Sequence, residues 1–202
     1  MEVRVRNART ADAAAIARIH VETWRDTYAA LLPARYLTST LSIERNALHW
    51  TRALRHADGR ERTLVAETSS GTVIAYAAFG RSRERLYPSD GELYALYVSL
   101  DQQDLGIGRL LCGATAEHLL AAGWQAMGVE VLAGNPSRYF YEAMGAQLSA
   151  TKSHVFAGEA LPALLYRWPE LTVLIAKTRR SEPNSTVDRA GRPIPPGRRR
   201  DR

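Results

Sequence analysis

A short glycine-containing turn is the part of this chain whose residue types and spacing are best suited to chemistry. An apolar run from Leu93 to Val98 leads into a polar turn, and Gln103-x-x-Gly106-x-Gly108 then opens a helical pattern. The first N–H groups of a helix have no partner within the helix, and they carry the positive end of its dipole. Such a turn binds anions, most often phosphate. The segment therefore predicts either a phosphate-binding turn or a tight strand-to-helix connection without a ligand, since short glycine motifs are often coincidental.

Two familiar nucleotide-binding motifs do not fit this turn. A dinucleotide fingerprint needs a third glycine three residues after the second, and Leu111 occupies that position. A mononucleotide loop ends in Gly-Lys followed by Ser or Thr, which the turn lacks. The sequence therefore argues against both a Rossmann-type dinucleotide and a P-loop nucleotide as the ligand.

Two segments together point to a family. The Gln103 turn, with its flanking strand and helix, resembles the coenzyme-A-binding motif of the GNAT N-acetyltransferase superfamily, Gln/Arg-x-x-Gly-x-Gly/Ala. Asn135-x(5)-Tyr141-x-x-x-Gly145 is similar to the second signature of that family. The resemblance covers most of residues 3–176, and it implies that backbone N–H groups of the turn bind the pyrophosphate of acetyl-CoA. The cofactor-binding residues that it implies are Leu96, Tyr97, Val98, Gln103, Asp104, Leu105, Gly106, Ile107, Gly108, Arg109 and Asn135.

One residue of the turn departs from the family pattern. Asp104 stands where family members often carry Gly or a basic residue. A carboxylate beside a pyrophosphate is unfavourable unless it points away. We therefore expect an affinity for CoA that is ordinary or weak.

Glu92 is the candidate general base. Amine acetylation needs a base for the amine, a group that stabilises the oxyanion and a proton for the leaving thiolate. Glu92 lies fourteen residues before Gly106, at the spacing where some amine-acetylating GNAT members carry a general-base glutamate. Burial near the sheet would raise its pKa and make it a better base near neutral pH. The alternative is an exposed carboxylate at the end of a strand.

Tyr141 is the general acid that the second signature implies, since in the family this tyrosine lies near the sulfur of CoA. A phenol with a pKa of about 10 is protonated at neutral pH. Asn135 either hydrogen-bonds the pantetheine or caps the following helix. The resemblance also implies that a backbone N–H near Tyr97 and Val98 meets the oxyanion, where this strand splays from its neighbour. We expect direct transfer in a ternary complex, with no covalent intermediate and no metal.

Aromatic residues near the N-terminus are candidates for the acceptor site. The segment His20-Val-x-x-Trp24-Arg-x-x-Tyr28 looks like that of a GNAT subgroup, and in this fold the first helices form a wall of the acceptor site. Trp24, Tyr28 and Tyr36 are therefore either substrate-binding residues or aromatic core residues at helical spacing. The acceptor expected is a primary amine of a small molecule or a protein.

Hydrophobic periodicity predicts the elements that must position these residues. Strands are predicted at 3–6, with an exposed edge, and at 63–67, 73–79, 92–98, 127–132, 148–156 and 164–175. Helices are predicted after an N-cap at Thr10, at 43–55, from the glycine turn to about Ala122, and at 136–144, with Gly123 and Gly145 as stops. The order β-α-α-β-β-β-α-β-α-β-β predicts an α/β fold of GNAT type, with a mixed, mostly antiparallel central sheet flanked by helices.

The charge of the chain is concentrated in its last residues. Residues 177–202 hold nine of the 27 Lys and Arg and three of the 21 Asp and Glu, which accounts for the whole net charge of +6. We therefore expect a neutral acetyltransferase domain over residues 1–176 and a disordered, basic Pro/Gly/Arg-rich tail over 177–202. The tail is either a solvated appendage or a site that binds nucleic acid.

The remaining composition limits the setting and leaves two rival functions. No apolar run is long enough to span a membrane, and the N-terminus lacks the core of a signal peptide. The single cysteine, Cys112, excludes an internal disulfide framework and is expected to be a buried structural thiol. These features fit a cytoplasmic enzyme without a membrane partner, and they are compatible with a homodimer. The rivals are a non-catalytic CoA-binding regulatory module and a ribosome- or protein-associated acetyltransferase whose tail contacts nucleic acid.

Overall fold

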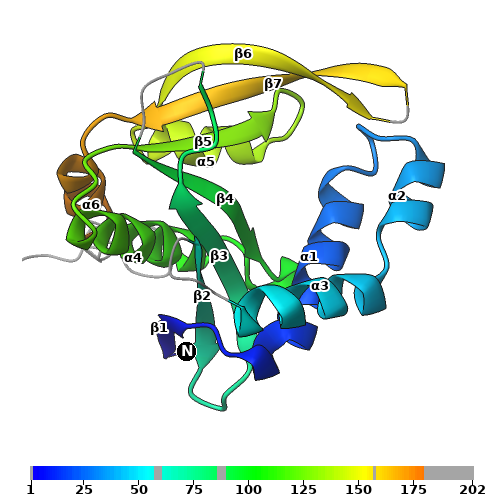
Figure 1. Ribbon diagram of the computed structural model, residues 1–202, viewed down its shortest axis with the longest axis horizontal. Coiled ribbons are helices and arrows are strands. Elements are labelled where there is room, and N and C mark those ends of the chain that lie inside the picture. Colours follow the sequence, from blue (N-terminus) through cyan, green and yellow to red (C-terminus); the bar gives the residue numbers. More distant parts are fainter. Residues whose placement is uncertain (1, 57–60, 86–89, 157, 180–202) are drawn as a thin grey trace, which may run out of the picture.

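A sheet of seven strands with helices on both faces forms the framework of the molecule (Figure 1). The computed structural model describes residues 2–56, 61–85, 90–156 and 158–179. The order across the sheet is β1-β2-β3-β4-β5-β7-β6, and β4–β5 is its parallel pair. The strands are β1 Val3–Asn7, β2 Glu61–Thr68, β3 Val73–Arg81, β4 Gly91–Val98, β5 Met127–Leu132, β6 Gln147–Phe156 and β7 Glu159–Trp168. The mixed, mostly antiparallel sheet of the sequence prediction is confirmed, as is the edge position of β1.

Six α-helices cover this sheet within the described residues. Helices α4, α5 and α6 share one apolar core with strands from β2 to β7, whereas α1, α2 and α3 pack in two smaller cores on the other side (Figure 1). They are α1 Ala13–Thr27, α2 Ala34–Thr40, α3 Ile43–Arg55, α4 Ile107–Ala121, α5 Ser137–Ala143 and α6 Leu171–Arg179. None of these helices is long and apolar enough to cross a bilayer.

Burial in the central strands follows from this two-sided cover. Every residue of β3 from Val73 to Gly80 is buried, as expected where helices lie on both faces of a sheet. On one face Phe79 packs in the core that contains Leu111 and Cys112 of α4. On the other face Tyr76 packs with Ile16 of α1. The predicted burial of Cys112 is confirmed.

The parallel pairing of β4 with β5 ends early. Three residue pairs join the strands, from Gly91↔Met127 to Leu93↔Val129. Both strands continue beyond this point, because β4 pairs with β3 as far as Val98, and β5 pairs with β7 as far as Leu132. The sheet therefore opens into a gap between two strands that are each held on their other side.

The end of the sheet corrects two sequence predictions. The strand predicted over 164–175 stops at Trp168, and helix α6 follows. Pro169 has no N–H to continue the ladder, and Leu171, Leu174 and Ile175 are buried at helical spacing. Because α6 runs to Arg179, the predicted domain boundary at 176/177 falls inside a helix. Residues 180–202 of the predicted tail lie outside the described residues.

Three local predictions have different outcomes at helix ends. Gly123 and Gly145 adopt φ values of +86° and +88° after α4 and α5, which confirms them as stops. Thr10 does not cap the first helix; it lies in a short 3-10 turn, Thr10–Asp12, in which the Asp12 carboxylate accepts a 2.7 Å bond from the Arg9 N–H. The short helix α2 carried no periodic signal in our sequence analysis.

An ion-pair cluster ties β1 to β2 and to the start of α1. The Arg6 guanidinium donates to Asp12 at 2.7 and 3.0 Å and to Glu67 at 2.7 and 3.1 Å, with 13% of its side chain exposed. The Arg6 hydrogen bonds, assisted by Arg4, lower the pKa of Glu67 to about 2. Since an ordinary glutamate titrates near pH ~4.3, Glu67 stabilises the fold above that pH, and this contribution is lost as the pH falls through about 2.

We predict that Glu67→Gln makes the free energy of unfolding less dependent on pH under acid conditions. Between about pH 4.5 and 2.5 the free energy of unfolding should fall more steeply in the parent than in this variant, as measured by urea unfolding at a series of pH values. Glu22→Gln, which changes an exposed carboxylate on α1, serves as the control and should follow the parent. Equal slopes for the parent and Glu67→Gln would contradict the predicted linkage.

Candidate functional site

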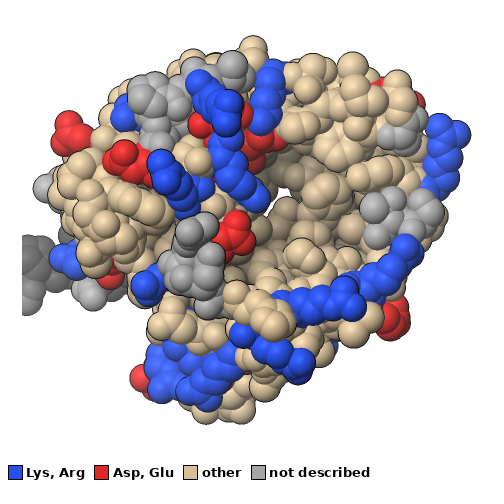
Figure 2. Space-filling view, viewed as in Figure 1, with Lys and Arg blue, Asp and Glu red and all other residues tan. Residues whose placement is uncertain are grey.

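A cleft of about 1480 Å³ passes through the gap between β4 and β5. Its walls include Phe140 and Tyr141 of α5 on one face of the sheet, and Thr23 of α1 and the following Tyr28 on the other. Figure 2 shows the hollow in the surface, with both acidic and basic side chains beside it and further Lys and Arg side chains along the rim formed by α2 and α3. The cleft is therefore open to both faces of the sheet, so that two molecules could meet within it.

The glycine turn forms one end of this cleft. Helix α4 begins at Ile107, after Gly106 at a φ of +82°, a left-handed conformation that favours glycine. Gln103 precedes the turn, and its side-chain amide donates to the Val98 carbonyl at 3.3 Å. The N–H groups of the first turn of α4 have no intrahelical acceptor, and Arg109 adds a cation. All eleven predicted cofactor-binding residues line the cleft: Leu96, Tyr97, Val98, Gln103, Asp104, Leu105, Gly106, Ile107, Gly108, Arg109 and Asn135.

Tyr141 lies in the cleft as the sequence predicted for a general acid. It sits on α5, where its ring meets Trp168 edge-on at 5.9 Å between centroids. Burial raises the pKa of its phenol well above the ordinary value, and the nearby phenol of Tyr97 adds to the effect. Tyr141 is therefore protonated throughout the neutral range and can act as a proton donor.

A hydrogen bond between distant parts of the chain crosses the cleft. The Asn135 amide donates to the Tyr28 hydroxyl at 2.9 Å, and the Asn135 side-chain oxygen accepts from the Ser137 N–H at 2.8 Å. The bond to Ser137 closes a turn before α5, whose N-cap is Pro136 without a side-chain cap bond. The capping role of Asn135 and its hydrogen bond to pantetheine both remain predictions. Burial also raises the pKa of Tyr28. This bond fixes α1 against the start of α5.

Glu92 is placed differently from the prediction. Its two oxygens accept from Arg83, one from the backbone N–H at 2.7 Å and one from the guanidinium at 3.1 Å. Its side chain is 11% exposed, and it pairs with Gly128 inside the joined part of β4 and β5. Among the described residues, those that line the cleft do not include Glu92. Glu92 therefore lies in the joined part of the sheet, bound to Arg83, and not at the cleft where the sequence placed a base.

Two of the three aromatic residues predicted for the acceptor site lie outside the described lining of the cleft. Tyr28 lines the cleft, whereas Trp24 and Tyr36 are absent from its described lining. The Trp24 indole donates to the Tyr97 hydroxyl at 2.7 Å and so supports a residue that does line it. Tyr36 packs edge-on against Phe156 at 5.7 Å between centroids. Helical spacing in the sequence did not distinguish the residues that line the cleft from those that pack against the lining.

Glu130 is a cleft residue that our sequence analysis missed. It is the single charged residue of β5, whose other side chains are apolar or absent, and 31% of its side chain is exposed. Its carboxylate contacts the Lys152 ammonium at 2.6 Å and bonds the His154 imidazole. A lone carboxylate in an apolar strand was the available signal.

Comparison with known proteins places the chain in a family. Residues 16–146 match the model of the acetyltransferase (GNAT) family. The uncharacterized N-acetyltransferase YuaI of Bacillus subtilis is 36% identical over 172 residues, which cover 85% of this chain and 96% of YuaI.

Solved structures share the fold at lower identity. The proposed acetyltransferase yncA of Salmonella typhimurium, solved with its cofactor acetyl-CoA, has a TM-score of 0.61 and 21% identity, covering 85% of this chain and 95% of yncA. The paiA N-acetyltransferase of Thermoplasma acidophilum, in complex with coenzyme A, has a TM-score of 0.59 and 17% identity, covering 83% of this chain and 100% of that one.

We predict that Tyr28→Phe destabilises the fold, because the Asn135 amide would lose its buried acceptor. An unsatisfied buried donor costs about 1–3 kcal/mol, which urea unfolding can resolve. Tyr36→Phe removes the hydroxyl of a tyrosine that packs through its ring and is the matched control, with an expected change below about 0.5 kcal/mol. Equal losses in both variants would contradict the importance of the Tyr28–Asn135 bond.

Proposed function

This chain belongs to the GNAT family of acetyltransferases, and from that premise we propose that it transfers an acetyl group from acetyl-CoA to a primary amine. The acceptor is an amine of a small molecule or a protein. The single observation that carries the proposal is the cleft through the open part of the sheet, which offers an anion-binding turn on one side and a separate approach on the other. Transfer is direct, in a ternary complex, without a covalent intermediate or a metal.

The residues of the turn fit the donor. The free N–H groups at the start of α4, together with Arg109, suit a pyrophosphate. Gly106 supplies the left-handed backbone, and Asp104 also adopts a positive φ, of 60°. The open edge of β4 leaves main-chain groups free to pair with pantetheine amides as an added strand would.

Each chemical role has a separate group. When bound, acetyl-CoA supplies the thioester, and a β4 backbone N–H near Tyr97 and Val98 stabilises the oxyanion. Tyr141 donates its proton to the departing thiolate. Cys112 takes no part as a nucleophile, because it is fully buried and burial raises its pKa to about 12. Because Glu92 lies outside the described lining of the cleft, we do not propose it as the base.

We predict that acetyl-CoA stabilises the parent protein against heat. At a ligand concentration of about 100 times Kd the gain is ~2.7 kcal/mol, which amounts to several degrees in Tm. Gly106→Ala strains the left-handed turn by about 1–2 kcal/mol and should raise Kd about tenfold, measured by thermal shift over a ligand titration.

The matched control is Gly71→Ala. Gly71 has a φ of +85° in the β2–β3 turn and, like Gly106, has nothing within 4 Å of an added Cβ. It should lower Tm without changing the Kd for acetyl-CoA. No stabilisation of the parent at high ligand, or equal Kd changes in both variants, would count against acetyl-CoA binding at the turn.

We predict that Tyr141→Phe lowers kcat about 10²-fold while leaving the Kd for acetyl-CoA unchanged, because it removes a proton donor. Initial rates of CoA release with an amine panel provide the measurement. Tyr166→Phe, which removes a buried phenol that bonds Glu142, is the control and should keep kcat within about threefold.

The outcomes separate the rival functions. Unchanged kcat in Tyr141→Phe would remove the role assigned to Tyr141. Binding of acetyl-CoA without transfer to any amine by the parent would favour a regulatory module.

A further inference from the structure

We infer that Glu130, rather than Glu92, is the carboxylate that binds the acceptor amine and receives its proton. This inference rests on the proposed function, because it assigns a residue to the acceptor side of the same cleft. It also implies a substrate class: cationic amines that carry no carboxylate beside the amino group.

The position of Glu130 in the sheet is the first argument. It follows Val129, whose pairing with Leu93 is the last between β4 and β5. Glu130 is thus the first residue of β5 beyond the joined part of the sheet, and it lines the cleft. Glu92 lies on the other side of that boundary, within the joined part.

The two partners of Glu130 come from β6, and one of them also contacts Glu84 in the segment after β3. The Lys152 ammonium lies 2.6 Å from one Glu130 oxygen and 2.7 Å from Glu84, while the His154 Nε2 bonds the other Glu130 oxygen. The Lys152 ammonium therefore contacts two carboxylates, those of Glu130 and Glu84. These contacts hold the Glu130 carboxylate in place, with 31% of its side chain exposed.

Glu130 also interacts electrostatically with Tyr28, on the α1 side of the cleft. After burial and the Asn135 bond, the charge of Glu130 is a further cause of the shifted pKa of Tyr28. The Tyr28 phenol in turn contributes to the raised pKa of the buried Tyr141. The groups that face Glu130 are therefore Lys152, His154 and Tyr28, with Glu84 reached through Lys152.

The charges along the cleft define what can enter from the acceptor side. Its charged lining residues are Asp26, Asp104, Arg109 and Glu130. Asp104 and Arg109 belong to the glycine turn, so the rest of the described lining carries two carboxylates and no Lys or Arg. Lys152, which lies outside this lining, offsets part of the charge of Glu130. With Asp26 also in the lining, the region favours an ammonium over a carboxylate. An amino-acid amide or a peptide N-terminus fits, whereas a free α-amino acid does not.

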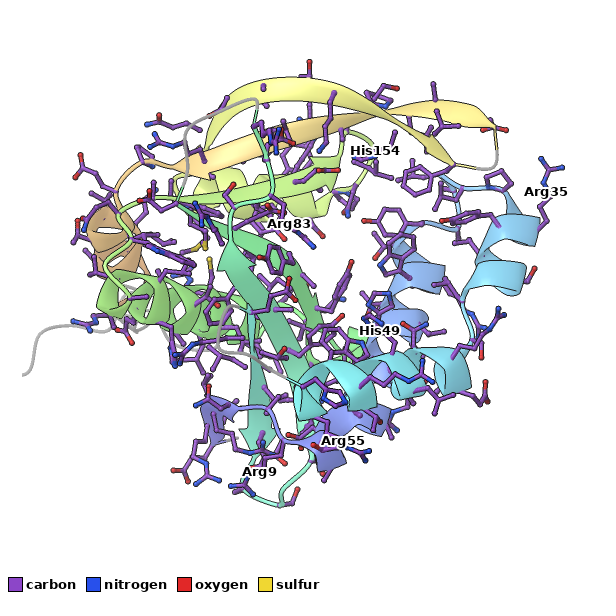
Figure 3. All side chains as sticks on the ribbon, viewed as in Figure 1. Arg9, Arg35, His49, Arg55, Arg83 and His154 are labelled. Atoms are coloured by element: carbon purple, nitrogen blue, oxygen red, sulfur yellow. The ribbon has the colours of Figure 1, made fainter. Side chains whose placement is uncertain are left out.

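The proton balance uses the same residues. The ammonium N–H bond breaks, and the proton passes to the Glu130–His154 pair and from the imidazole, which is 38% exposed, to water. Figure 3 labels His154 on β6, at the edge of the hollow across from His49 of α3. The nitrogen forms its bond to the carbonyl carbon and loses a second proton by the same route, through Glu130 and His154 to water, while the C–S bond breaks. The sulfur takes a proton from Tyr141, which water restores, so that one proton is released overall.

The test compares matched acceptors: leucine, phenylalanine and lysine, each against its C-terminal amide. We expect the parent to prefer each amide in kcat/KM by about tenfold or more. Glu130→Gln should lower kcat/KM for the amides about 10- to 100-fold and narrow the preference, with the Kd for acetyl-CoA unchanged. Glu130→Asp keeps the charge and should keep the preference, which separates a lost carboxylate from a damaged fold. Glu22→Gln is the surface control.

Each result decides a different question. Loss of activity in Glu92→Gln with none in Glu130→Gln would overturn the inference, and so would a parent that prefers free amino acids. A parent that transfers acetyl to no acceptor would instead contradict the proposed function.

Discussion

The early end of the β4–β5 pairing is the constraint on which the site depends. Three residue pairs join these strands, after which their facing N–H and C=O groups have no partner in the opposite strand. Unpaired main-chain groups inside a protein are unfavourable unless something else meets them. The gap is therefore both the weak point of the sheet and a place where a ligand with amide groups can be bound.

The surrounding structure keeps this gap open. β3 holds β4 and β7 holds β5 over their full lengths, so neither strand is free to close on the other. The Tyr28–Asn135 bond then fixes α1 against the far side of the opening. Closure would have to displace buried phenols and break this bond. The molecule thus positions the glycine turn, Tyr141 and Glu130 around one passage without any of them being near neighbours in sequence.

Local sequence patterns were sufficient to predict most helices and strands. They did not reveal the contacts that side chains make once the chain is folded. Alternation, glycine stops and the glycine turn predicted most elements and the donor side of the cleft. The spacing of Glu92 from Gly106 did not reveal that Arg83, in the segment between β3 and β4, folds back onto this carboxylate. Glu130 was missed because Lys152 and His154 come from another strand. Trp24 and Tyr36 are separated from Tyr28 by intervals typical of one helix face. Tertiary packing nevertheless places them outside the described lining of the cleft. The strand predicted over 164–175 failed at Pro169, whose local signal was available in the sequence.

The most direct test of this account is a crystal structure of the protein with acetyl-CoA and a non-reactive acceptor analogue. We predict the pyrophosphate at the N–H groups of Gly106 to Gly108, the thioester in the gap between β4 and β5, and the Tyr141 hydroxyl within hydrogen-bond distance of the sulfur. The amine analogue should reach the thioester from the α1 side, beside Glu130. A CoA molecule bound outside the gap, or donor and acceptor entering from the same face, would contradict the account.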